Sequence, residues 1–352
     1  MNKNSQTIIG PSWKRHVEKS EGFGRAVAMM VFINLLLLIV VLFVSGVLLT
    51  SCLKENMLNC PEQIRVYFTY TDNRTLTGEG YPINPEHVDR MHLYVFNEKG
   101  YYIDEYCDEN IVVFDEAYYI DCSDLLPGRY SFIAWGGKNE DSYFTALANS
   151  SDLTPFVKNK TGFDEVLLML KRSGNDVSTP VHHLFHSDIP ATVAYTKIQR
   201  FDMPLMQLTN TINIRTVKMT ANANNYRFDI MDNNDAYTFD GFFATDVTDP
   251  SFTYTTPCTK NNTGQVSATL NVMRLAENRH TPQLQVYNES SDEVLFQSDD
   301  LIKLILKANP ENDFDTTHIY NIDIIFDSDD DLQFTIFVNG WVVREQDDDL
   351  FE

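Results

Sequence analysis

The residues with the clearest chemical meaning are Leu49-Thr50-Ser51-Cys52, which end a long apolar run. Basic residues precede the run, and the chain turns polar directly after the cysteine. This arrangement is typical of a bacterial lipoprotein signal, in which the bond before the cysteine is cut and the cysteine then carries the lipid. We therefore predict a signal peptide over residues 1–51 and lipidation at Cys52.

An uncleaved transmembrane anchor is the alternative interpretation of this segment. The apolar run is about the length that spans a bilayer, roughly 20 residues, whereas a typical signal core has roughly 7–15. Small residues directly before Cys52 favour the lipoprotein. Met29 or Met30 is an alternative start, although it would leave no basic residues ahead of the run. Both interpretations place the residues after 52 outside the cytoplasm.

The remaining cysteines are Cys60, Cys107, Cys122 and Cys258, an even number that an oxidising compartment can pair. Cys107 and Cys122 flank a predicted hairpin, so they are the pair we predict to form a disulfide. A loop of that length would contribute about 3 kcal/mol in the chain-entropy model. Buried free thiols are the alternative. No two of these cysteines have the short spacing of a zinc site.

The rest of the sequence does not indicate an enzyme. The sequence contains no Gly-x-Ser-x-Gly, no His-Glu-x-x-His and no phosphate-binding glycine loop. His182, His183 and His186 lie close together but lack a carboxylate at a familiar spacing, so we interpret them as part of a polar linker rather than a metal site. The acidic turn at residues 327–331 lacks the glycine and glutamate of a calcium loop. We predict no catalytic residues, no metal and no cofactor.

The net charge argues against nucleic acid as a partner. Removing residues 1–51 takes away five basic and two acidic side chains, which changes the net charge from −23 to −26. Nucleic-acid binding needs clustered lysine and arginine. Such an acidic surface suits a solvated extracellular protein.

After residue 60 the chain is predicted to be all-β. Alternating apolar residues mark short strands, such as Ile64, Val66 and Phe68 near the start and Tyr320, Ile322 and Ile324 near the end. Prolines and a Ser-Gly-Asn turn within residues 173–200 mark a domain boundary. We therefore predict a tether over residues 52–60 and β-sandwich domains over residues 61–185 and 186–352. A short helix at residues 141–149 is the exception, because sustained helical periodicity is absent after residue 52.

Several residue groups together resemble the anchor subunits of Bacteroidales-type (type V) fimbriae, which are fimbrillin-like lipoproteins. In chain order the groups are Cys60-Pro61, Phe68-Thr69-Tyr70, Leu93-Tyr94-Val95-Phe96 with Glu98-Lys99-Gly100, Leu126-Pro127-Gly128-Arg129-Tyr130 running to Ala134-Trp135-Gly136-Gly137, Leu184-Phe185-His186 and Val338-Asn339-Gly340-Trp341. The resemblance implies two tandem transthyretin-like Greek-key β-sandwich domains after an N-terminal lipoprotein signal. It also implies a role in fimbrial assembly, fimbrillin-like stalk subunits as partners, and attachment to the outer membrane, surface-exposed, through the lipid.

Subunits of this kind are expected to join by β-strand addition, in which a strand from one subunit completes the sheet of another. An anchor keeps its N-terminal strand, here near residues 64–70, so its own groove stays closed. The donor would then be the C-terminal stretch that contains Trp341 and Val343. The alternative for Trp341 is that it fills the core of the second domain. Alternative functions are a surface glycan-binding lipoprotein that uses exposed tyrosines, and a tip or accessory subunit of the fimbria.

Overall fold

The computed structural model describes residues 29–31, 34–38, 63–70, 73–74, 80–81, 88–138, 142–148, 156–177, 180–194, 198–217, 226–244, 252–260, 265–326 and 334–345. The chain forms two compact units, Met1–Pro61 and Glu62–Glu352. In the first unit, residues 29–31 and 34–38 are helical, but no helix among the described residues is long and apolar enough to cross a membrane. Cys52, Cys60 and the acidic turn at residues 327–331 lie outside the described residues.

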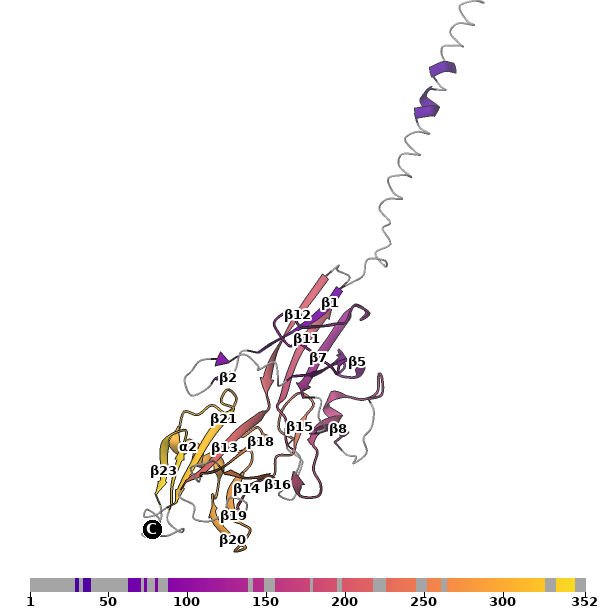
Figure 1. Cartoon of the computed structure of the whole chain (residues 1–352). Helices are drawn as coiled ribbons and strands as arrows, with labels where there is room; N and C mark the ends of the chain where they lie inside the picture. Colours follow the sequence, from indigo (N-terminus) through magenta and orange to yellow (C-terminus); the bar gives the residue numbers. More distant parts are fainter. Residues whose placement is uncertain are drawn as a thin grey trace, which may run out of the picture. The chain divides into compact units, whose positions relative to one another are not determined.

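The second unit begins with a seven-stranded sheet whose strands follow the order β5-β4-β7-β11-β12-β1-β6. Of these, β1, β5, β7, β11 and β12 are labelled in Figure 1. These strands are β1 (Gln63–Tyr70), β4 (Arg90–Asn97), β5 (Tyr102–Asp108), β6 (Tyr119–Asp121), β7 (Gly128–Gly137), β11 (Leu184–Val193) and β12 (Ile198–Gln207). A separate two-stranded ladder pairs β2 (Asn73–Arg74) with β3 (Gly80–Tyr81). Most of the seven strands are antiparallel, but β1 runs parallel to β12.

At β4, both faces of the seven-stranded sheet are covered. Because side chains alternate along a strand, Leu93 and Val95 of β4 lie on one face with Ile111 and Leu125, which come from the connection between β5 and β7. On the opposite face, Tyr94 and Phe96 of β4 pack into a second and larger cluster. A sheet with two buried faces needs apolar residues at consecutive positions, which accounts for the continuous run Leu93-Tyr94-Val95-Phe96.

A small sheet, in the order β15-β9-β8, contributes to the larger cluster. It consists of β8 (Tyr143–Leu147), β9 (Val166–Leu170), which follows the short 3-10 helix η3 (Phe163–Glu165), and β15 (Ala236–Thr238). The helix predicted at residues 141–149 is therefore wrong. Residues 143–147 instead pair antiparallel with β9, and this long-range pairing overrides the local preference of the segment.

The C-terminal half is a β-sandwich of two sheets. The six-stranded sheet has the order β17-β18-β13-β21-β22-β23, and the five-stranded sheet has the order β10-β16-β14-β19-β20. The strands of the six-stranded sheet are β13 (Thr209–Val217), β17 (Thr259–Lys260), β18 (Val266–Met273), β21 (Ile319–Phe326), β22 (Phe334–Val338) and β23 (Trp341–Glu345). Those of the five-stranded sheet are β10 (Asp176–Val177), β14 (Tyr226–Asp232), β16 (Phe252–Pro257), β19 (Gln283–Asn288) and β20 (Glu293–Gln297).

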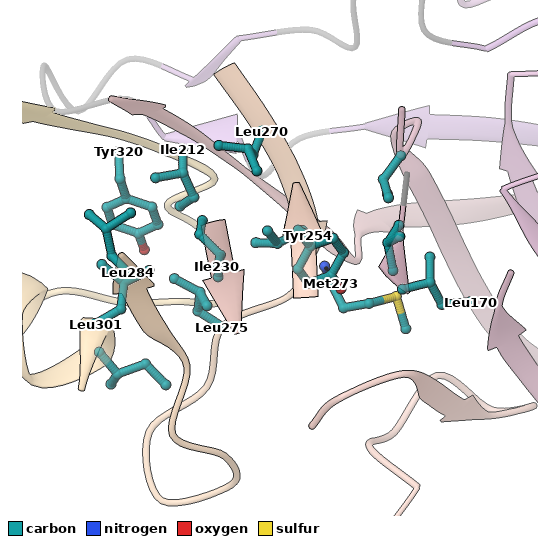
Figure 2. Packing of buried hydrophobic residues seen from close by; sticks show 14 of the residues in the cluster. Leu170, Ile212, Ile230, Tyr254, Leu270, Met273, Leu275, Leu284, Leu301 and Tyr320 are labelled. Atoms are coloured by element: carbon teal, nitrogen blue, oxygen red, sulfur yellow. Dashed lines mark hydrogen bonds between the residues drawn. The ribbon is translucent and has the colours of Figure 1, made fainter. Parts of the chain in front are cut away.

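The core of this half lies between the two sheets (Figure 2). Ile212 and Tyr320 from the six-stranded sheet pack in the same cluster as Ile230 and Leu284 from the five-stranded sheet, and each of them is fully buried. The fold is therefore all-β, as the alternating pattern predicts. One helix was missed: α2 (Leu301–Ala308) is capped by the Asp300 carboxylate, which accepts hydrogen bonds from the Ile302 and Lys303 N–H groups.

The chain leaves the seven-stranded sheet after Gln207, because β11 and β12 both belong to that sheet. The boundary predicted between residues 185 and 186 falls inside β11. Pro190 is compatible with a strand here because β11 pairs with β12 only at Phe185 and His186, so the proline has a single neighbouring strand, β7. In addition, β10 pairs with β16 and β9 pairs with β15. Strands from before and after Gln207 therefore share two of the sheets.

Candidate functional site

The first feature of functional interest is β1, which lies inside the seven-stranded sheet. All eight of its residues pair in parallel with β12, from Gln63 opposite Ile198 to Tyr70 opposite Leu205, and Arg65 to Tyr67 pair with β6. Its inward side chains, Ile64, Val66 and Phe68, are 1%, 0% and 3% exposed. Each such burial is worth about 1.5–3 kcal/mol. The N-terminal strand of the body thus fills the groove between β12 and β6 with its own side chains.

The second feature is β23, which forms an edge of the six-stranded sheet. It joins β22 through a tight turn in which Asn339 and Gly340 have φ values of +52° and +84°, the left-handed conformation that two-residue hairpin turns need. A β-bulge interrupts the pairing, so that Phe337 faces Val342 while Ile336 faces Arg344. Among the described strands, β23 is paired along one side only. Its other side presents backbone N–H and C=O groups that another strand could pair with.

The side chains of β23 divide between solvent and core. Trp341 is 66% exposed and Val342 is 51% exposed, so the alternative in which Trp341 fills the core is wrong. Val343, at the bulge, packs partly buried against the larger core cluster. Leu350 and the remainder of the C-terminal tail lie outside the described residues. An exposed edge strand that begins with a tryptophan is the kind of surface that binding partners cover.

Comparison with known proteins identifies the family. A family model described as fimbrillin-A associated anchor proteins Mfa1 and Mfa2 matches residues 57–347, a range that contains both β1 and β23. The chain belongs to this family. It is a fimbrial protein, and the family groups structural subunits rather than enzymes. The resemblance drawn from the sequence motifs is therefore confirmed.

Three solved structures share the fold of this Mfa2-family member. The fimbrial anchor protein Mfa2 from Porphyromonas gingivalis is 19% identical, with a TM-score of 0.60 over 80% of this chain and 99% of that one. A candidate polysaccharide-binding protein from Bacteroides thetaiotaomicron is 23% identical, with a TM-score of 0.65 over 81% and 98% of the two chains. A candidate adhesin from the same organism is 20% identical, with a TM-score of 0.64 over 82% and 99%. No curated protein matches the chain.

In this member of the Mfa2 family, the predicted Cys107–Cys122 disulfide is not formed, and both thiols are free. The physical reason is the sheet itself. Cys107 pairs with His92 on the face that carries Tyr94, whereas Cys122 is buried in the cluster on the opposite face. Partial burial, and to a smaller extent repulsion from the Glu109 and Glu105 carboxylates, raises the pKa of Cys107 to about 11. Burial raises the pKa of Cys122 even further.

The three histidines near the predicted boundary do not form a metal cluster. His186 is buried in β11 beside Trp135, with ring centroids 4.4 Å apart. His183 instead approaches the Gln207 amide and the Thr209 hydroxyl, with Nδ1 at 3.1 Å and 3.3 Å. Within the described residues, the group of three side chains close enough to hold a metal ion is His92, Glu105 and Cys107, which the sequence analysis missed.

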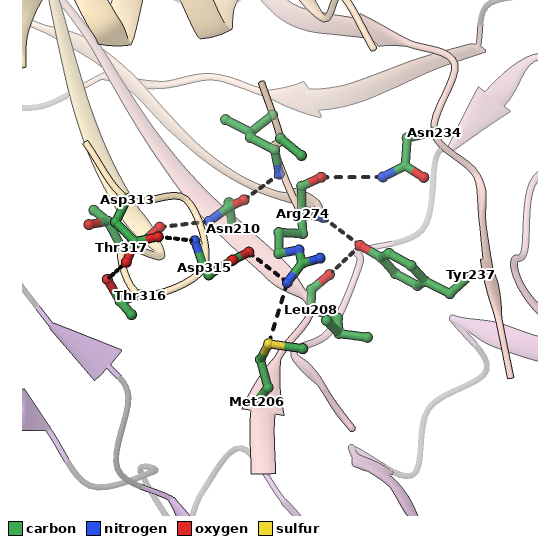
Figure 3. Close-up of polar contacts among 12 residues, drawn as sticks. Met206, Leu208, Asn210, Asn234, Tyr237, Arg274, Asp313, Asp315, Thr316 and Thr317 are labelled. Atoms are coloured by element: carbon green, nitrogen blue, oxygen red, sulfur yellow. Dashed lines mark hydrogen bonds and ion pairs between the residues drawn. The ribbon is translucent and has the colours of Figure 1, made fainter. Parts of the chain in front are cut away.

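A buried polar network holds the point where the chain passes from β12 to β13 (Figure 3). The Tyr237 hydroxyl donates to the Leu208 carbonyl and accepts from the Arg274 N–H, both at 2.8 Å. The Asn210 side chain accepts from the Leu275 N–H at 2.6 Å and donates to the Thr317 carbonyl at 3.1 Å. Because these groups are buried, each lost bond would leave an unpaired polar atom. The network therefore fixes the passage between the sheet that contains β1 and the sheet that ends at β23.

Proposed function

We propose that this fimbrial subunit anchors the fimbria to the outer membrane and joins its neighbour by β-strand addition. The observation that carries the proposal is the contrast between β1 and β23. β1 already fills the groove of its own sheet, so that groove cannot accept a strand from another subunit. β23 offers an exposed edge and the side chains of Trp341 and Val342. The partners are fimbrillin-like stalk subunits.

Membrane attachment in this proposal runs through the lipid on Cys52. Ten residues separate that cysteine from Gln63, the first residue of β1. A strand inserted between two neighbours transmits force from the tether directly into the sheet. Retention of β1 thus serves both attachment and closure of the groove. Changing Cys52 to alanine should release the protein, together with its fimbriae, from the outer membrane.

The joining surface can be tested with charges placed on the edge strand. Lysines on an exposed edge oppose the pairing of another strand. In the full chain, Trp341→Lys combined with Val342→Lys should leave the protein in the membrane but shed fimbriae into the medium. The matched control is Val294→Lys on β20, because Val294 is 47% exposed on an edge strand of the other sheet. Electron microscopy and partner pull-down would read the result. Fimbriae that stay attached to cells carrying the double variant would refute β23 as the joining strand.

Polysaccharide binding is a second candidate function, supported by a ladder of rings and guanidinium groups on the outer side of β1. The Arg200 guanidinium lies 3.9 Å from the Tyr67 ring centroid, and that of Arg65 lies 4.4 Å from the Tyr119 ring centroid. The two rings are 5.4 Å apart. Flat aromatic surfaces of this kind can stack on sugars.

The second candidate function has its own test on a polysaccharide column. Tyr67→Ala and Tyr119→Ala should each weaken retention of the full chain, whereas Tyr101→Ala, at another exposed tyrosine, should not. Equal retention of all three variants would exclude the ladder as a sugar-binding surface.

A further inference from the structure

The hairpin of β4 and β5 brings three metal-ligating side chains together. His92 on β4 lies directly opposite Cys107 on β5, and Glu105 precedes Cys107 by two residues, so all three project from one face. One ligand atom from each residue lies within 4.8 Å of the others. The Cys107 Sγ is 3.3 Å from the His92 Nε2, and the His92 Nδ1 contacts the Glu105 carboxylate.

The hairpin holds His92 in place. β4 pairs with β5 on one side and with β7 on the other, where His92 faces Trp135. The imidazole also stacks on the Tyr94 ring, with centroids 5.9 Å apart and planes inclined by 13°. The side chain of His92 is 17% exposed and that of Glu105 is 30% exposed, whereas Cys107 is exposed. His92 and Glu105 are thus partly shielded and held by strands, and Cys107 faces solvent.

The donor set and its spacing suit zinc. Thiolate sulfur, imidazole nitrogen and carboxylate oxygen are the three ligand types that zinc takes from proteins. With Zn–S and Zn–N bonds of about 2.3 Å and 2.0 Å at a tetrahedral angle, the sulfur and nitrogen should lie about 3.5 Å apart. The sulfur–nitrogen distance here, 3.3 Å, is close to that value. The Glu105 carboxylate contacts Nδ1, on the far side of the imidazole from Nε2, so it orients the ring as an outer partner and is not a ligand of the same ion. The Cys107 sulfur and the His92 Nε2 are then the two protein ligands, and water completes the coordination.

A positive charge already lies beside this group. The Arg90 Nε donates to the His92 Nε2 at 2.6 Å, and the Arg90 Nη2 donates to Glu109 at 3.2 Å. The side chain of Arg90 is 32% exposed. It can therefore turn away from the imidazole while keeping its ion pair with Glu109. A divalent cation would then replace the guanidinium as the positive charge beside Glu105, and it would stabilise the thiolate that Cys107 forms on losing its proton to solvent.

We propose that the Cys107 thiolate and the His92 Nε2 bind one zinc-class divalent cation at the β4–β5 edge of the seven-stranded sheet, while the Glu105 carboxylate holds the imidazole from Nδ1. This site is independent of the proposed joining surface at β23, since it lies on a different sheet. Binding displaces the thiol proton of Cys107, and the ion cross-links two adjacent strands.

The test uses the full chain, stripped of metal with a chelator, then titrated with Zn²⁺ in a calorimeter and with Co²⁺ in a spectrophotometer. The wild type should bind one ion, and its Co²⁺ form should show sulfur-to-cobalt charge transfer. Cys107→Ser should abolish that band, and Cys107→Ser and His92→Gln should each weaken Zn²⁺ binding at least tenfold. Cys258→Ser is the matched control, because this half-buried thiol lies on another part of the fold and should change neither result.

Two outcomes would overturn the site. One is a wild-type chain that binds no Zn²⁺ or gives no charge-transfer band with Co²⁺. The other is equal affinity in the wild type, Cys107→Ser and His92→Gln. Thermal unfolding of each variant in chelator shows whether it folds. If His92→Gln does not fold, Glu105→Gln takes its place, since it preserves the shape of the side chain and should also lower Zn²⁺ affinity.

Discussion

Buried His186 makes the stability of the protein depend on pH in a way that can be calculated. Its side chain lies in β11 and is 2% exposed. Gly241, with φ of +85°, makes room for the ring, because a Cβ there would lie 2.4 Å from the His186 Nδ1. Burial disfavours the charged imidazolium and lowers the pKa of His186 to about 3. In the unfolded chain the pKa of histidine is about 6.5.

The sign and size of the effect follow from proton linkage. Between these two pKa values the unfolded chain binds a proton that the native protein does not, so acid favours unfolding. The stability gained from the neutral ring is complete above pH 6.5 and is lost as the pH falls toward 3. From pH 7 to pH 5 the loss amounts to about 2 kcal/mol of unfolding free energy.

The assay is urea unfolding of the wild type and His186→Gln at pH 7 and pH 5. Carboxylates titrate in both proteins, so their contribution cancels in the comparison. The unfolding free energy of the wild type should fall by about 2 kcal/mol more than that of the variant. Ser187→Ala, at a buried neighbour in β11 that does not titrate, should keep the wild-type dependence. Equal pH dependence in the wild type and His186→Gln would refute the claim that burial keeps this imidazole neutral.

Three further substitutions test the packing and the polar network. Phe68→Ala should lower the unfolding free energy by about 3–5 kcal/mol in urea titrations, because it leaves a cavity under β1; a loss below 1 kcal/mol would contradict the closed groove. Arg172→Met should cost about 3–5 kcal/mol, because it removes the guanidinium that lies 2.8 Å from the fully buried Asp235 carboxylate. Tyr237→Phe should cost about 1–3 kcal/mol by removing the hydroxyl between Leu208 and Arg274. For Arg172→Met and Tyr237→Phe, thermal unfolding would measure the loss of stability, and an unchanged unfolding midpoint in either variant would contradict its prediction.

Much of the fold is predictable from local pattern. Alternation of Ile64, Val66 and Phe68 identifies both the strand and its buried face, because side chains of a strand alternate whatever its neighbours are. The turn at Asn97–Gly100 and the Asn339-Gly340 turn between β22 and β23 are likewise local, since they depend on residues that tolerate positive φ. The ordered motifs were enough to indicate the family.

Pairing partners were not predictable in the same way. Residues 141–149 carry a weak local preference, and only the presence of β9 as a neighbour makes residues 143–147 a strand. The domain boundary predicted between residues 185 and 186 has the same physical cause, because β11 and β12 join the first sheet only through pairing with strands distant in sequence. Turn-forming residues mark where a chain can bend, but the strands with which the next segment pairs lie far away in sequence.

The sequence by itself determined the strands that carry alternating apolar residues, the apolar face of each of these strands, and the family of the chain. Tertiary structure decided the register. With a regular ladder from Phe96 opposite Tyr102, His92 would face Tyr106, but a bulge after Val95 shifts the pairing by one residue. His92 therefore faces Cys107, on the opposite side of the sheet from Cys122. Side chains alternate with a period of two, so one inserted residue moves Cys107 away from its predicted disulfide partner Cys122 and places it beside His92 as a candidate metal ligand. No local sequence pattern predicts that insertion.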